Sequence, residues 1–226
     1  MPRLARVDIG NEIYHVINRA VGRLQIFNKD EDYKLFEDIM LEAKDLSGMR
    51  ILAYTIMPNH WHLVLHPQND GDLGVFMHRL TNAHTRRVHV KTETIGYGPL
   101  YQGRYKSFLV DSDKYFLTLL KYVERNPVRA KLTKRCEDWR WGSAYRRSVG
   151  ETVQNQILDV SPVPFPLDYT AWINTPDTEN DLGSIRLSVN KGAPYGRENW
   201  VETMTKLYKL ETTQRLAGRP RKAIRP

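Results

Sequence analysis

Residues 57–66 read Met-Pro-Asn-His-Trp-His-Leu-Val-Leu-His, and this stretch sets the architecture of the chain. Pro58-Asn59 predicts a turn, and the apolar residues that follow predict a strand covered on both sides. Side chains on a strand alternate between its two faces, so His60 and His62 share one face and Trp61 lies on the other. Two neighbouring imidazoles on rigid backbone can begin a divalent-metal site. The pair alone is more typical of ordinary polar or packed histidines.

The elements around this stretch alternate between strand and helix patterns. Runs rich in β-branched and aromatic residues predict strands, and apolar residues at helical spacing predict helices. The predicted order is strand, helix, strand, strand, helix, strand, helix, over Val7–Asn18, Glu31–Asp45, Arg50–Met57, His60–His66, Leu73–Val90, Tyr101–Val110 and Asp113–Arg125. The first six elements match the ferredoxin-like split βαβ arrangement, an antiparallel sheet of the α+β class with helices on one face. The last helix is an addition to that arrangement.

The C-terminal third is less regular. We predict an irregular linker over residues 148–180 and a helical, basic extension over residues 181–226 that contacts DNA. Helices at Asp181–Asn190 and Arg197–Leu210 either form a helix-turn-helix-like unit or pack on the preceding domain. The segment Gly218–Lys222 is similar to an AT-hook core but has Ala217 where an arginine is expected, so a disordered basic tail is the alternative.

Charge and cysteine content narrow the class of partner and the compartment. The formal net charge of +8 predicts an anionic partner, most simply nucleic acid. A single cysteine, Cys136, excludes a disulfide within the chain and favours the reducing cytoplasm. No stretch approaches the ~18 apolar residues of a membrane span, so we expect no membrane contact. The basic residues lie in blocks, as a phosphate-tracking groove needs, and the candidates for DNA contact are Arg79, Arg86, Arg87, Arg104, Lys106, Arg219 and Arg221.

The last predicted helix of the domain carries a tyrosine and an amide on one face. Tyr122 and Asn126 are four residues apart and therefore stack one turn from each other. Tyr115 lies two turns earlier on the same face. One interpretation is structural, in which Tyr122 packs on the sheet and Asn126 caps the helix before Pro127. The other interpretation is catalytic.

Four motifs together favour the catalytic interpretation. In order, they are His60-Trp61-His62, Tyr101–Ser107, Tyr122–Ala130 and Asp138–Tyr145. This set resembles the single-tyrosine HUH transposases and, more narrowly, the REP-associated tyrosine transposases of bacteria. The resemblance covers residues 3–147, and it identifies residues 1–147 as an HUH nuclease domain.

The resemblance implies a metal-dependent endonuclease and strand transferase that acts on single-stranded DNA with a hairpin structure. It implies that His60, His62 and Asn126 hold Mg²⁺ or Mn²⁺ and that Tyr122 forms a 5′-phosphotyrosine intermediate. Tyr115 is the second candidate for the nucleophile. The resemblance also implies a cytoplasmic, nucleoid-associated bacterial protein, and it leaves open whether one subunit or a homodimer completes each active site.

Two other functions stay open. A domesticated relative could keep the fold and the DNA contacts but regulate or organise DNA without cutting it. An RNA-recognition module shares the strand and helix order, but it needs exposed stacking aromatics on its central strands, where this chain has histidines.

Overall fold

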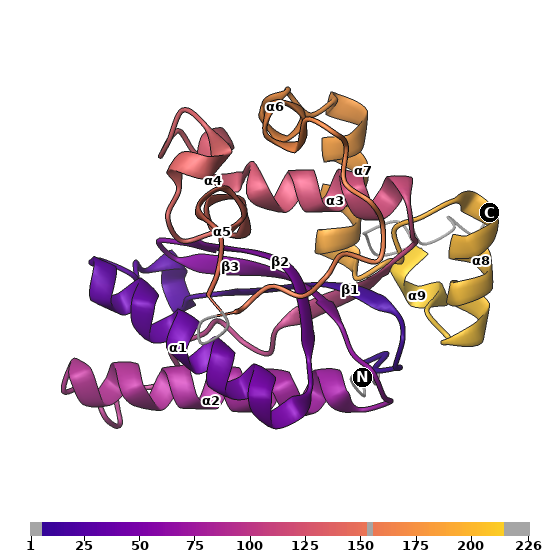
Figure 1. The fold of residues 1–226 in the computed structure, drawn as a ribbon. Helices are drawn as coiled ribbons and strands as arrows, with labels where there is room; N and C mark the ends of the chain where they lie inside the picture. The colour runs from indigo at the N-terminus through magenta and orange to yellow at the C-terminus, as the bar shows by residue number, and fades with distance from the viewer. Residues whose placement is uncertain (1–5, 153–155, 215–226) are drawn as a thin grey trace, which may run out of the picture.

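A four-stranded antiparallel sheet organises the computed structural model, which describes residues 6–152 and 156–214 (Figure 1). The spatial order of the strands is β2-β3-β1-β4. Their bounds are Ile13–Arg19 for β1, Arg50–Met57 for β2, His60–His66 for β3 and Lys106–Val110 for β4. β1 and β3, the two central strands, are buried along almost their whole length, as expected for strands covered on both faces.

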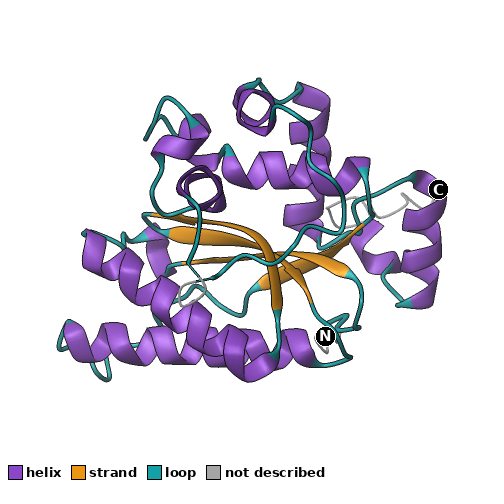
Figure 2. Ribbon diagram, in the orientation of Figure 1, coloured by secondary structure: helices purple, strands orange, loops and turns teal. Residues whose placement is uncertain are grey.

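Helices cover both faces of this sheet (Figure 2). α1 (Asp30–Ser47) and α2 (Asp72–Lys91) pack on one face, and α3 (Lys114–Glu124) packs on the other. The alternation along β3 follows from this layering. Trp61 is buried with α1 and α2, whereas Val64 is buried with α3. The predicted α+β class, with a ferredoxin-like sheet and an added helix, is confirmed.

Two predicted strands are longer than the observed ones. β1 begins at Ile13 because the residues before it bond instead to the segment that joins β3 to α2: Gly71 N donates to Asp8 O, and Asn11 N donates to Pro67 O. β4 begins at Lys106 because the preceding segment pairs with the chain near the end of β1 through an isolated bridge between Ala20 and Tyr101 rather than through a continuous ladder.

Two short helices follow α3 at the end of the predicted nuclease domain, α4 (Asn126–Arg129) and α5 (Ser143–Val149). The C-terminal part after them is more regular than predicted and packs on the domain, with helices α6 (Tyr169–Asn174), α7 (Glu179–Lys191), α8 (Glu198–Leu207) and α9 (Glu211–Gln214). α6 lies inside the predicted irregular linker, because Asp168 caps it and Ile173 is buried against Cys136. After α7, Tyr195 N donates to Leu109 O. This bond favours helices packed on the domain over an independent helix-turn-helix unit.

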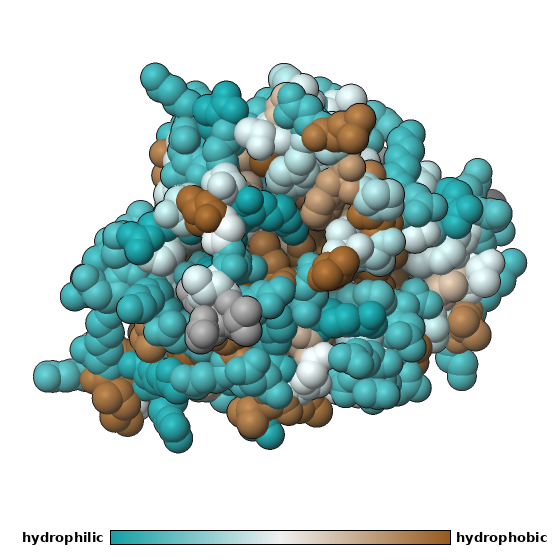
Figure 3. Space-filling view, viewed as in Figure 1, coloured by the Kyte–Doolittle hydropathy of each residue, from teal (hydrophilic) through white to brown (hydrophobic). Residues whose placement is uncertain are grey.

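The surface agrees with a basic, polar protein. Figure 3 shows hydrophilic side chains over most of one face, with hydrophobic residues in separate patches. No helix of the described residues is long and apolar enough to span a membrane.

A polar cluster lies inside the core between the sheet and α2. Trp61 Nε1 donates to the hydroxyl oxygen of Tyr101 at 3.0 Å, and this hydroxyl lies 2.6 Å from His84 Nδ1. The tyrosine hydroxyl can donate to Nδ1 or accept from it, and His84 Nε2 is a buried atom with no partner among the described residues. Burial lowers the pKa of His84 to about 3.

This histidine makes the fold acid-sensitive. The unfolded chain takes up a proton on His84 near pH 6.5, and the folded chain does so only near pH 3, so stability falls as the pH drops below about 6.5. The expected slope is about 1.4 kcal/mol per pH unit for this residue. We predict that His84→Gln flattens the dependence of urea-unfolding free energy on pH between 6.5 and 5. The exposed control His78→Gln should leave the slope unchanged, and equal slopes for all three proteins would contradict the assignment.

Candidate active site

The packing of α3 on the sheet brings a tyrosine over a pair of histidines. The ring centroids of Tyr122 and His62 are 6.0 Å apart, and the rings meet edge to face at 84°. His60 and His62 share one face of β3, with ring centroids 5.1 Å apart. The structure therefore brings together three of the predicted site residues, which lie about sixty positions apart in the sequence.

The turn residue Asn59 orients the first imidazole. Asn59 Nδ2 donates to Arg23 O, so Asn59 Oδ1 is the atom that lies 2.7 Å from His60 Nδ1. A carbonyl oxygen can only accept, and His60 therefore carries its hydrogen on Nδ1. This tautomer leaves the lone pair of His60 Nε2 available for a ligand.

His15 on β1 orients the second imidazole. His15 Nε2 lies 2.9 Å from His62 Nδ1, and both rings are buried. If His62 donates this hydrogen bond, its Nε2 is free to bind a metal, and the hydrogen of His15 lies on Nδ1. That Nδ1 atom is buried without a partner among the described residues. A metal-binding histidine usually donates its second N–H to an acceptor that orients the ring, and His15 Nε2 would be that acceptor for His62.

All three imidazoles are neutral at pH 7. Burial lowers the pKa of His15 to about 3, and burial together with the Arg19 charge lowers the pKa of His60 to about 4. Burial, with smaller effects from His15 and neighbouring arginines, holds the pKa of His62 well below its usual range. Neutral imidazole is the form that binds metals, so these rings are ready as ligands.

Asn126 lies at the junction between α3 and α4. Its Nδ2 donates to the backbone oxygens of Tyr122 and Val123 at 3.1 and 3.2 Å, although the cap residue of α3 is Arg125 and Asn126 begins α4. These bonds fix the amide orientation and leave Oδ1 without a hydrogen bond to the described residues. The described chain holds no group of three or more His, Cys, Asp or Glu side chains suited to a metal. A site here would combine two imidazoles with this amide oxygen.

An arginine lies against the ring of Tyr122. The guanidinium carbon of Arg129 is 4.2 Å from the ring centroid, and its Nη2 donates to the backbone oxygen of the same tyrosine. Asp177, which follows α6, accepts from both Arg129 and Arg125 at 3.0 and 2.9 Å. A residue of the predicted linker thus holds a positive charge beside the candidate nucleophile.

The second candidate tyrosine lies elsewhere. Tyr115 packs edge to face on Tyr195, with ring centroids 5.2 Å apart, and both rings belong to the cluster between α3 and α7. No ring contact joins Tyr115 to His60 or His62 among the described residues.

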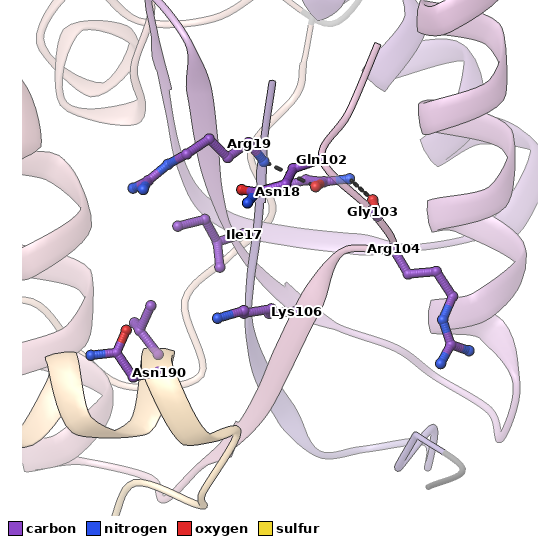
Figure 4. A pocket seen from close by; sticks show the side chains of 9 residues that line it. Ile17, Asn18, Arg19, Gln102, Gly103, Arg104, Lys106 and Asn190 are labelled. Atoms are coloured by element: carbon purple, nitrogen blue, oxygen red, sulfur yellow. Dashed lines mark hydrogen bonds between the residues drawn. The ribbon is translucent and has the colours of Figure 1, made fainter. Parts of the chain in front are cut away.

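The predicted DNA-contact residues fall into separate regions. Arg79, Arg86 and Arg87 lie on α2, on the opposite side of the sheet from Tyr122, and Arg87 pairs with Glu42. Arg104 and Lys106 lie beside the end of β1, in a pocket drawn in Figure 4. Arg219 and Arg221, with the AT-hook-like segment, lie outside the described residues. DNA contact by these residues stays a prediction.

Sequence reasoning missed His15, Asn59, Arg129 and Asp177. A local signal was present for two of them, because His15 lies among apolar residues in a predicted strand and Asn59 directly precedes a histidine. Nothing local connects Asp177 to the site.

Comparisons with known proteins identify the family of the chain. The family model described as "Transposase IS200 like" matches residues 9–126, more than half of the chain, so the chain belongs to the IS200-like transposase family. The resemblance found in the sequence is confirmed at this level, and the family indicates transposase-type processing of DNA.

Two solved structures resemble the chain. A REP-associated tyrosine transposase bound to a REP hairpin has a TM-score of 0.56 and 18% identity, over 71% of this chain and 96% of that chain, and thus shares the fold. A Deinococcus radiodurans protein described as a candidate transposase has a TM-score of 0.38 and 25% identity, over 55% of this chain and 97% of that chain. A comparison with curated proteins found no match.

The ion pairs of Asp177 with Arg125 and Arg129 can be tested by their contribution to the stability of the fold. Asp177 is 5% exposed as a side chain, so Asp177→Asn leaves two guanidinium groups without a counter-charge in a nearly buried place. We predict that this change lowers the free energy of unfolding by about 3–5 kcal/mol in urea titrations. The matched change Asp30→Asn breaks an exposed pair with Arg140 and should cost at most about 1 kcal/mol. Equal costs would contradict the role of Asp177.

Proposed function

We propose that this chain is a metal-dependent single-stranded DNA endonuclease and strand transferase with Tyr122 as its nucleophile. The observation that carries the proposal is the edge-to-face placement of Tyr122 over His62, beside a second histidine whose tautomer leaves Nε2 free. Pure DNA binding requires no such arrangement. The membership of the IS200-like transposase family supports the same conclusion.

The residues present fit a hard divalent cation. His60 Nε2, His62 Nε2 and Asn126 Oδ1 are the ligands we propose for Mg²⁺ or Mn²⁺. Two neutral nitrogens and one amide oxygen suit a cation that keeps open positions for water and phosphate, rather than a closed structural zinc site. When bound, the cation acts as a Lewis acid on the scissile phosphate.

The proposed step involves two of the chain's own residues. The Tyr122 hydroxyl gives up its proton as its oxygen forms a bond to the phosphorus, the bond from phosphorus to the 3′-oxygen breaks, and the departing 3′-oxygen takes up a proton. Arg129 places a positive charge beside the ring, where negative charge gathers during the attack. The product is a 5′-phosphotyrosine with a free 3′-hydroxyl.

The covalent intermediate explains strand transfer without a nucleotide cofactor. The phosphotyrosine keeps the energy of the broken phosphodiester bond, so the 3′-hydroxyl of another strand can attack it and release Tyr122. The substrate we propose is hairpin-bearing single-stranded DNA. Support comes from the net positive charge and from the fold shared with a transposase that is bound to a REP hairpin. A homodimer stays a prediction, as does a place at the nucleoid.

The nucleophile can be identified directly. Tyr122→Phe should abolish covalent protein–DNA adducts on a denaturing gel after incubation with hairpin-bearing single-stranded DNA and Mn²⁺. Tyr115→Phe is the matched control and should retain the adducts, because Tyr115 packs on Tyr195 away from the histidines. Adducts lost only in Tyr115→Phe would overturn the assignment. DNA binding by the wild type without adducts in Mn²⁺ or Mg²⁺ would favour the non-catalytic DNA-binding alternative.

The residues that support the imidazoles can be tested by metal binding alone. His15→Phe and Asn59→Ala each remove the partner of one imidazole Nδ1. We predict that each weakens Mn²⁺ binding about 10–100-fold, measured by electron paramagnetic resonance without DNA. His66→Gln changes a histidine at the far end of the same strand and should leave the affinity unchanged. Unchanged affinity in all three variants would contradict the proposed ligand set.

A further inference from the structure

A pocket of about 290 Å³ adjoins the histidine pair on the side of α7. Its walls come from the end of β1, the segment 102–104, the start of β4 and the last turn of α7 (Figure 4). This volume is near the lower end of the range for small-molecule sites, ~300–1,000 Å³, and suits a single nucleotide.

The register of the sheet fixes the position of this pocket relative to the candidate active site. Arg19 lies opposite His60, Ile17 lies opposite His62, and Lys106 lies opposite Ile17 on the other side of β1. Directly opposite residues in an antiparallel pair present their side chains on the same face. The row from His62 through Ile17 to Lys106 therefore crosses three strands, about 10 Å in all. One nucleotide can bridge this distance.

Two cations of this pocket are free to bind an anion. Arg19 and Lys106 make no ion pair and no side-chain hydrogen bond with any described residue. The arginines that support the fold differ, since Arg125, Arg129 and Arg147 are each held by a carboxylate. In Figure 4, the side chains of Arg19 and Lys106 extend toward the side where Asn190 lies, and Arg104 points the opposite way.

α7 supplies the opposite wall. Val189 and Asn190 line the pocket, and the Asn190 amide forms no hydrogen bond with the described residues. The position of this wall is fixed, because Tyr195 after α7 bonds on both sides to the end of β4: its N donates to Leu109 O, and its O accepts from Asp111 N. Arg197 adds an ion pair to Asp111 at 2.8 Å.

The polarity of α7 orients a bound nucleotide. Val189 and Asn190 belong to the C-terminal turn of α7, where the backbone carries partial negative charge and repels phosphate. Phosphate therefore belongs at Arg19 and Lys106. The base then lies toward α7, where Ile17 and Val189 offer apolar contact and the Asn190 amide can both donate to and accept from a base edge.

We propose that this pocket binds the nucleotide next to the scissile phosphate, with Arg19 and Lys106 on a backbone phosphate and Asn190 reading the base. The inference rests on the proposed function for the position of the scissile linkage. It gives α7 of the C-terminal extension a role in sequence selection.

Binding in EDTA tests the pocket without cleavage. Fluorescence anisotropy would use the full chain and hairpin-bearing oligonucleotides whose single-stranded flanks carry each of the four bases in turn. Lys106→Ala should weaken binding about tenfold, the loss expected for one charge-assisted contact. It should also lower the slope of log affinity against log salt by about 0.7, as expected for one phosphate on a single strand. Lys34→Ala removes one charge at an exposed position of α1 and is the matched control. It should change neither the affinity nor the salt slope.

Asn190→Ala should remove the base preference at one flanking position and leave the salt slope unchanged. Asn180→Ala, near the other end of the same helix, should keep that preference. The inference is overturned if Lys106→Ala has the same affinity and salt slope as Lys34→Ala. It is also overturned if Asn190→Ala keeps the base preference as Asn180→Ala does, or if the preferred base is not adjacent to the nucleotide that Tyr122 captures. Wild-type protein that binds with these preferences but forms no adduct would contradict the proposed function and leave the pocket's role as a nucleotide site supported.

Discussion

A buried carboxylate at the end of α3 is the constraint on which the arrangement of the site depends. Glu124 is 1% exposed and accepts hydrogen bonds from Ser143, Arg147 and Tyr169. Because a buried charge without partners is strongly unfavourable, these contacts can be satisfied only when α3 sits at one height over β2. Thr55 Oγ1 of β2 adds a bond to Val123 O, at 2.9 Å. Tyr122 directly precedes Val123 and Glu124 in α3, so the contacts of these two residues also fix the position of Tyr122 over the histidines.

The two faces of the sheet have different roles: one forms the main core, and the other carries the candidate site. α1 and α2 bury the largest apolar cluster, which includes Trp61 and encloses the polar contacts of Trp61 and His84 with Tyr101. The α3 face carries the candidate site, where His15, His62 and Tyr122 meet and are all buried. Since Trp61 is buried by the first layer, the two histidines on either side of it are held to the second. Because side chains alternate between the two faces of β3, burying Trp61 in the core also directs His60 and His62 toward the candidate metal site.

Local patterns in the sequence predicted much of this, and contacts between distant residues account for the rest. The order of strands and helices, the shared face of His60 and His62 and the helix that carries Tyr122 follow from periodicity within short windows. The hydrogen bond between His15 and His62 joins residues 47 positions apart, and the pair of Arg129 with Asp177 joins residues 48 positions apart. Hydrophobic periodicity within a short window cannot predict either of these contacts. For the basic residues of α2, the sequence showed the charge, but it could not show that they lie on the opposite side of the sheet from Tyr122.

The C-terminal part is joined to the site rather than appended to it. Asp177 holds the arginine beside Tyr122, Tyr195 extends the edge of the sheet at β4, and α7 walls the pocket next to the histidines. These contacts involve three separate segments after residue 150. Dividing the chain into a domain, a linker and an extension by composition could not predict any of them. An exposed edge strand such as β4 also invites pairing with other chains, and the bonds from Tyr195 cover its end. The same segment therefore protects the sheet and shapes the surface that a DNA strand would meet.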